Sequence, residues 1–149
     1  MANPLSDYYD LKPQQMFLVS QKALMVSDGR LLLLQLSDGQ WELPGGLLDF
    51  GEDLRSGLLR EVYEETGLAV EIRQLVALSD RQGMKFTLRD GRVMDTSFIV
   101  AAFYCAVTGG EFRLSHEHCA HHWATRGEIQ RLTIAANSRF AVDYYLSAE

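Results

Sequence analysis

Residues 46–68 read GLLDFGEDLRSGLLREVYEETGL, and the acidic residues near the end of this segment set the first constraint on the structure. Glu61, Glu64 and Glu65 lie within five positions of one another and are followed closely by Gly67. On an exposed helix each like-charged pair at this spacing costs roughly 0.2–0.5 kcal/mol, and the cost rises where water is excluded. A positively charged partner is therefore expected at this point of the chain.

The same segment carries the signals of a helix over residues 54–66. Asp53 is a typical N-cap, and Gly67 is typical of the position after the last helical turn. Apolar side chains recur every four positions between them: Leu54, Leu58 and Val62. Gly57 lies inside the predicted helix at a cost of about 1 kcal/mol relative to Ala, so tight packing is expected beside it.

The acidic side chains do not lie opposite the apolar stripe of this helix. At about 100° per residue, Glu65 falls at about +40° and Glu64 at about −60° from Glu61, while the stripe covers about +20° to +100°. A solvated acidic face, the ordinary alternative, would point away from the stripe. A divalent cation such as Mg²⁺ or Mn²⁺ prefers carboxylate oxygens, and the helix offers no His or Cys for zinc. We therefore predict a metal site here, next to a glycine-rich loop at 43–46 whose carbonyls can join the ligands.

The rest of the chain alternates strand and helix signals. Two Asp-Gly pairs, at 28–29 and 90–91, are typical of tight hairpin turns, and the apolar run 98–107 is typical of a central strand buried on both faces. Strands are predicted at 16–26, 31–36, 68–78, 85–88 and 93–107 and before Trp123, with a turn at 108–111 and helices at 126–132 and 138–146. This order favours a single domain of α/β (α+β) class over residues 1–149, with helices on both faces of a mixed β-sheet and a loose arm at 1–14.

Composition excludes several classes of protein. The formal net charge of −6 and the pI of about 5.2 argue against polymeric nucleic acid or an anionic membrane as the main partner. The two cysteines are too few for a disulfide framework, and the first twenty residues lack the apolar stretch of a signal peptide. We therefore expect a cytoplasmic protein.

The acidic segment resembles the Nudix box. In this chain the pattern is Gly46, five residues, Glu52, seven residues, and then REVYEETGL at 60–68, and every specified position matches. With average residue usage a chance match has a probability on the order of one in 10⁹ per starting position. The resemblance implies a Nudix-like α/β/α sandwich with a mixed β-sheet, in which the box forms a loop, a helix and a second loop that bind Mg²⁺ or Mn²⁺.

The resemblance also implies roles for single residues of the box. Metal ligands are implied at four positions: the carbonyl of Gly45 and the carboxylates of Glu61, Glu64 and Glu65. Glu61 matches an acid that is the general base in some members, so Glu61 and Glu64 are predicted to be catalytic. Structural support of the site is implied for three residues: Gly46, Glu52 and Arg60.

One further catalytic acid is implied in a loop after the central strands. The segment LSHEHCAHHWA at 114–124 matches that loop, so we predict Glu117 as this acid, with Glu111 and Asp95 as alternatives. A solvated turn is the ordinary interpretation of Glu111.

The same loop holds all four histidines of the chain, at positions 116, 118, 121 and 122, around Cys119. Their spacing matches no closed four-ligand zinc site. His118 is a candidate for substrate contact, with a half-buried structural histidine as the alternative. Trp123 is a candidate for stacking on a base, with a core indole at a strand end as the alternative.

Members of the family cleave a diphosphate linked to another group, usually a nucleoside. The resemblance therefore implies a Mg²⁺-dependent hydrolase of a nucleoside diphosphate derivative, and a small-molecule phosphoanhydride as its partner. Because sub-family features of other substrate classes are absent, we predict a nucleoside triphosphate that yields a monophosphate and pyrophosphate. Nucleotide sugars and dinucleotides stay open as substrates, as does a non-catalytic nucleotide-binding module, although a degenerate module is expected to lose box acids and this chain keeps them. A homodimer is compatible with the sequence.

Overall fold

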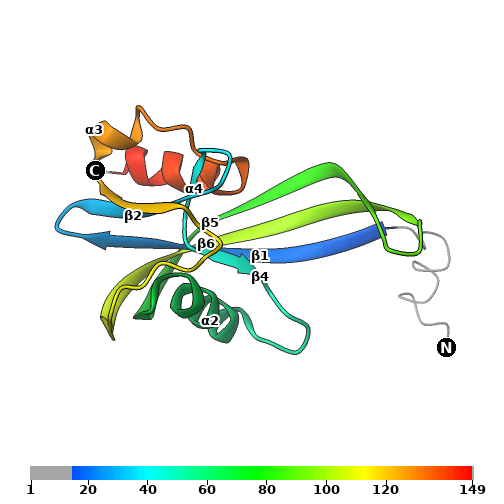
Figure 1. Ribbon diagram of the computed structural model, residues 1–149, viewed down its shortest axis with the longest axis horizontal. Coiled ribbons are helices and arrows are strands. Elements are labelled where there is room, and N and C mark those ends of the chain that lie inside the picture. Colours follow the sequence, from blue (N-terminus) through cyan, green and yellow to red (C-terminus); the bar gives the residue numbers. More distant parts are fainter. Residues whose placement is uncertain (1–14, 149) are drawn as a thin grey trace.

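The computed structural model describes residues 15–148, in which a mixed sheet lies between helices on its two faces (Figure 1). The elements are β1 (Gln15–Ser27), β2 (Arg30–Gln35), β3 (Trp41–Glu42), β4 (Gly45–Leu47), α2 (Leu54–Thr66), β5 (Leu68–Thr87), β6 (Val93–Gly110), β7 (Ala120–Ala124), α3 (Arg126–Ile129) and α4 (Ala136–Ser147). Helix α2 covers one face of the sheet, and α3 and α4 lie on the other. The predicted α/β/α sandwich is therefore confirmed, whereas the arm predicted at 1–14 lies outside the described residues. Within residues 15–148 no helix combines the length and the hydropathy needed to cross a bilayer.

The sheet is mixed because its central pair of strands is parallel. The order is β3-β2-β1-β6-β5, with β4 also paired to β1 and β7 to β2. Strands β1 and β6 run parallel from Gln15–Asp95 to Met25–Cys105, and the other pairs are antiparallel. The predicted hairpin between β1 and β2 is confirmed, since both turn residues, Asp28 (φ 50°) and Gly29 (φ 71°), take the left-handed conformation of a type I′ turn.

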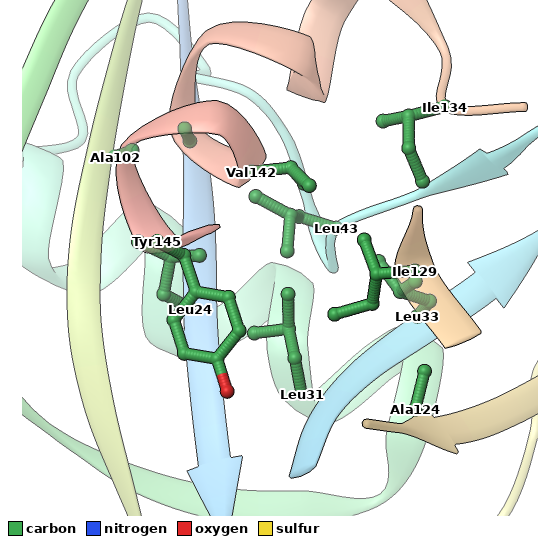
Figure 2. Close-up of a cluster of buried hydrophobic side chains, with 11 residues drawn as sticks. Leu24, Leu31, Leu33, Leu43, Ala102, Ala124, Ile129, Ile134, Val142 and Tyr145 are labelled. Carbon is green, nitrogen blue, oxygen red and sulfur yellow. The ribbon is translucent and has the colours of Figure 1, made fainter. Parts of the chain in front are cut away.

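Two apolar clusters fill the space between the sheet and the helices. The first includes Leu24, Leu31 and Leu43 under Val142 and Tyr145 of α4, and Figure 2 shows these side chains converging. The second lies on the opposite face, where Leu58 and Val62 of α2 pack with residues of β1, β2 and β5. Because α2 is held by this second cluster, the acidic side of the helix has a fixed position against the sheet.

Helix α2 has the boundaries that the sequence predicts. The side chain of Asp53 accepts a hydrogen bond from the Ser56 N–H at 2.7 Å, and Gly67 (φ 70°) ends the helix. Tight packing beside Gly57 is also confirmed, since a Cβ there would lie 2.6 Å from the side-chain amide of Gln21. Leu54, in contrast, is 39% exposed, so the buried stripe begins only at Leu58.

The segment 43–46, predicted as a loop, is in part a strand. Residues Gly45–Leu47 form β4 and pair with Ser20–Lys22 of β1. Gly45 has a φ of 140°, and a Cβ there would lie 2.0 Å from the backbone oxygen of Gln21. Only glycine allows this close approach of two backbones.

Other differences concern the lengths of elements. The strands predicted at 68–78 and 85–88 form the single strand β5, which crosses several β-bulges. The turn predicted at 108–111 is wrong for most of its residues, because β6 continues to Gly110 and pairs there with Leu68. At the end of the apolar run, Val107 is 41% exposed, so burial on both faces holds only for the middle of the strand. Helix α3 ends at Ile129 rather than at 132.

Candidate functional site

The last turns of α2 meet the short strand β4, and two glycines make the contact possible. The carboxylate of Glu65 is buried and accepts a hydrogen bond from the Gly45 N–H at 2.9 Å. A Cβ on Gly46 would lie 2.7–2.8 Å from the atoms of the Glu61 carboxylate. The missing side chain of Gly46 therefore lets β4 lie directly against Glu61, while the N–H of Gly45 holds Glu65.

A single guanidinium holds the acidic cluster together. Arg60 binds Glu52 with two hydrogen bonds, from Nε at 2.6 Å and from Nη2 at 3.0 Å. Its Nη1 donates to Glu61 and to Glu64, both at 3.1 Å. Because Glu52 fixes the plane of the guanidinium, Arg60 orients both catalytic candidates and partly offsets the repulsion between them. The predicted pair of Glu52 and Arg60 is thus present in the structure.

A second polar group lies deeper and was not predicted. Glu42 accepts a hydrogen bond from the Lys22 ammonium at 3.0 Å and one from the Asn137 amide at 2.8 Å, and His118 Nε2 lies 3.0 Å from its other oxygen. Glu42, Glu65 and His118 are all buried, and their potential ligand atoms lie within 4.8 Å of one another. This group therefore connects the acidic end of α2 to the loop before β7 and to the start of α4.

The two buried carboxylates have pKa values that are shifted in opposite directions. Burial raises the pKa of Glu65 to about 7, and its hydrogen bond from Gly45 offsets this only in part. Burial acts in the same direction on Glu42, but hydrogen bonds from His118 and Asn137 and the charge of Lys22 lower the pKa of Glu42 to about 2. Glu42 is therefore ionised at neutral pH, whereas Glu65 is about half protonated there.

Glu61 is the third acid whose ionisation is altered. Its side chain is 17% exposed, and burial raises its pKa. The neighbouring charges of Glu64 and Glu117 act in the same direction, and Arg60 opposes them. The charge of Glu117 thus raises the pKa of Glu61, although Glu117 is exposed and belongs to a loop that is far away in sequence.

A cavity of about 610 Å³ opens over these groups. Its acidic part holds Glu42, Glu61, Glu64, Glu65 and Glu117, and its remaining lining residues are Ser20, Lys22, Leu36, Gly45, Gly46, Leu47, Arg81, Phe98, Val100, His118 and Asn137. This volume is in the range of cavities that bind small molecules. The structure therefore brings together all the predicted metal ligands, the predicted catalytic acids and His118.

The alternatives to Glu117 lie elsewhere. Asp95 is on β6, pairs with Lys85 and lines a different, smaller hollow with Gly83 and Thr96. Glu111 is exposed just after the end of β6, as the solvated-turn interpretation predicts. Among the three acids, Glu117 is the one that lines the cavity.

The histidines and Trp123 do not form a common site. His118 is buried against Glu42, whereas His121 stacks on Phe112 with ring centroids 4.1 Å apart. His122 lies 3.4 Å from a carboxylate oxygen of Glu128, and His116 is exposed in a turn. Trp123 is half-buried and packs against the apolar cluster under α2, and its stacking on a base stays a prediction.

The missed residues Lys22, Glu42 and Asn137 come from three different elements. One signal could have indicated Glu42, since an acidic residue directly before the buried Leu43 must be paired if it is buried itself. Lys22, in the middle of an apolar strand, offers the complementary charge. Nothing in the local sequence indicates Asn137, which reaches Glu42 across 95 positions.

Comparison with known proteins gives a consistent result. A model of the NUDIX domain matches residues 17–144. A MutT-like protein of Streptomyces ambofaciens is 39% identical over 103 residues, which cover 68% of this chain and 59% of that protein. The nucleoside triphosphatase NudI of Escherichia coli is 31% identical over 108 residues, which cover 67% of this chain and 76% of NudI. The chain thus spans about three fifths of the length of the first relative and about three quarters of the second.

Solved structures show the same fold. A MutT NUDIX hydrolase from Burkholderia pseudomallei superposes with a TM-score of 0.69 at 25% identity, covering 87% of this chain and 98% of that one. A structure described as an ADP-ribose pyrophosphatase from Streptococcus suis gives a TM-score of 0.67 at 23% identity, covering 87% and 89%. The likeness to the second structure concerns the fold alone.

Proposed function

The chain belongs to the Nudix family, and we propose that it is a hydrolase of pyrophosphate bonds that cleaves a ribo- or deoxynucleoside triphosphate to the monophosphate and pyrophosphate. The observation that carries this proposal is the cluster of Glu61 and Glu64, held by Arg60, and Glu65, held by the Gly45 N–H, which opens onto a cavity of about 610 Å³. The similarity to NudI, a nucleoside triphosphatase, supports the substrate class.

The alternatives have less support. A nucleotide sugar or dinucleotide is suggested by the ADP-ribose pyrophosphatase structure, but that likeness is at 23% identity and extends only to the fold. A non-catalytic module would not need carboxylates that Arg60 holds in fixed positions by ion pairs. The cytoplasmic location and the homodimer stay predictions from the sequence.

The residues of the cluster fit a divalent metal ion. We propose that Mg²⁺ or Mn²⁺ is held by the carboxylates of Glu61, Glu64 and Glu65 and by the carbonyl of Gly45, a set of oxygen donors that these ions prefer. Glu42 is less suited as a ligand, because Lys22 and Asn137 already donate to its Oε2 and His118 lies within hydrogen-bond distance of its Oε1. When bound, the metal would neutralise the charge of the diphosphate and make its phosphorus more electrophilic.

The residues of the chain then have separate tasks. Glu61, whose raised pKa makes it a stronger base than an exposed carboxylate, accepts the proton of the attacking water at a carboxylate oxygen. The water oxygen forms a bond to phosphorus, and the phosphoanhydride oxygen leaves with pyrophosphate. Arg60 keeps Glu61 and Glu64 in place during this step, and Glu117 supplies a further carboxylate to the cavity from the loop before β7.

A substrate panel tests the proposal. The purified chain is incubated with nucleoside triphosphates, ADP-ribose, a UDP-sugar and a dinucleoside polyphosphate in the presence of Mg²⁺, and release of phosphate and pyrophosphate is measured separately. We expect pyrophosphate and a monophosphate from triphosphates, with activity lost in a chelator and restored by Mg²⁺. Cleavage of nucleotide sugars alone, or activity that survives chelation, would overturn the proposal.

Metal affinity should rise with pH through neutrality. Because the folded-state pKa of Glu65 is raised to about 7, a proton must leave before the carboxylate binds a cation. Below this pKa each pH unit should therefore strengthen Mn²⁺ binding by up to about tenfold, and above it the affinity should level off. Calorimetric titration of the protein with MnCl₂ at pH 6, 7 and 8 measures this. Equal affinity at pH 6 and pH 8 would contradict the expectation.

A further inference from the structure

The cavity has an end that the proposed mechanism does not use. Away from the carboxylates of α2, its wall is formed by the extended part of the sheet, where Phe98 and Val100 of β6 and Arg81 of β5 line it. Phe98 is half-buried, and the ring of Phe86 lies beside it, with centroids 6.2 Å apart and the ring planes tilted by 60°. This end of the cavity thus combines an aromatic ring and a guanidinium.

The strand register places this pair at a defined distance from the acidic end. Arg81 is directly opposite Phe98, and Lys22, which reaches Glu42, is level with Ala102 of β6. Four residues along β6 separate these two positions, or about 13 Å at about 3.3 Å per residue. Alternation places Phe98, Val100 and Ala102 on the same face of the sheet. The ring and the guanidinium therefore lie on the face of Lys22, at a distance that a ribose and a base extending from the phosphates can cover.

Arg81 differs from the other cation of the cavity in having a free charge. Lys22 is occupied by Glu42 and by the Leu43 carbonyl, at 3.0 and 3.1 Å. Within residues 15–148, Arg81 has neither an ion pair nor a side-chain hydrogen bond. A guanidinium without a protein partner, beside an aromatic face in a cavity, is available for a ligand.

We infer that Arg81 and Phe98 form a subsite for a nucleobase that presents a carbonyl oxygen, an inference that rests on the proposed nucleotide substrate. Phe98 offers its face for stacking, which any base can use. Arg81 has only donors to offer, so it pairs with carbonyl and ring-nitrogen acceptors, as on the O6 and N7 edge of guanine. Adenine has an amino group in place of the carbonyl, so its N–H donors would face the N–H donors of Arg81. The subsite therefore favours guanine and uracil over adenine.

Equilibrium binding of nucleoside monophosphates tests this without catalysis or metal. The full chain is titrated calorimetrically with GMP, UMP and AMP. Each of these nucleotides carries one phosphate, so differences in their affinities report the contribution of the base. We expect GMP and UMP to bind about tenfold more tightly than AMP, and Arg81→Met to remove this difference. Phe98→Leu should weaken all three about tenfold. Arg89→Met, in the hairpin turn, and Phe17→Leu, on the opposite face of the sheet, serve as matched controls that should bind as the wild type does.

Three results would overturn the subsite. They are equal binding of GMP and AMP by the wild type, an equal loss for all three nucleotides in Arg81→Met, which would indicate a phosphate contact, and no effect of Phe98→Leu. None of these three results would affect the proposed hydrolysis of triphosphates, which the substrate panel tests separately. Conversely, base-dependent binding without any hydrolysis would refute the proposed activity and leave the subsite intact.

Discussion

Glu64→Gln should lower the metal-dependent turnover by at least about a hundredfold and leave the fold intact. The side chain of Glu64 is 56% exposed, and its one hydrogen-bond partner among the described residues is Arg60, which stays bound to Glu52. Glutamine keeps the shape but removes the negative charge that the proposed cation requires, so a loss of about 10²–10³ in kcat is expected, or about 3–4 kcal/mol in the barrier. The measurement is kcat for a nucleoside triphosphate at saturating Mg²⁺, together with the thermal unfolding midpoint.

Glu71→Gln provides the matched control for this variant. The side chain of Glu71 is 51% exposed and also pairs with an arginine, Arg73, but it lies on β5 outside the cavity lining. Its removal should leave kcat unchanged. Full activity in Glu64→Gln would refute the assignment of Glu64 as a metal ligand, and a large fall in its unfolding midpoint would show that its role is structural.

Gly45→Ala should cost about 3 kcal/mol or more of folding free energy. The added Cβ would lie 2.0 Å from the Gln21 oxygen, which is backbone and cannot turn away as a side chain can. The φ of 140° adds strain for any L-residue, and overpacking and backbone strain each cost about 1–3 kcal/mol. Denaturant unfolding monitored by the two tryptophans measures the loss.

The control is Gly109→Ala, since Gly109 lies in β6 and a Cβ added there would meet no heavy atom within 4 Å. It should unfold near the wild-type midpoint. A wild-type midpoint for Gly45→Ala would mean that the pairing of β4 with β1 can shift at little cost, and that the Gly45 N–H is not needed to hold Glu65.

The parts of the fold that local sequence determines were predicted well. Helix α2 is delimited by Asp53 and Gly67, whose roles depend only on neighbouring backbone groups, and its boundaries agree with the prediction. The turn at Asp28 and Gly29 is a similar case. Strand β4 was missed because its hydrogen bonds are made to β1, and the clash that requires Gly45 arises only when that partner is present.

In the site, too, contacts between residues close in sequence could be predicted and contacts between distant residues could not. The acids of α2 and Arg60 are close in sequence, so their pattern could be recognised from the chain alone. Glu42 meets His118 across 76 positions, and no local pattern encodes such a contact. The opposite pKa shifts of Glu42 and Glu65 could not be predicted either, because burial raises both and only Glu42 receives the hydrogen bonds of His118, Asn137 and Lys22.

The parallel pairing of β1 with β6 has a consequence for how the protein is made. Strand β1 ends at Ser27, yet its long partner begins only at Val93, so about two thirds of the chain must leave the ribosome before the two can join. Until then α2 has no complete surface to cover, and closing so large a loop slows folding. A nascent chain stalled before β6 should therefore be unable to bind manganese, although every box residue has already been synthesised.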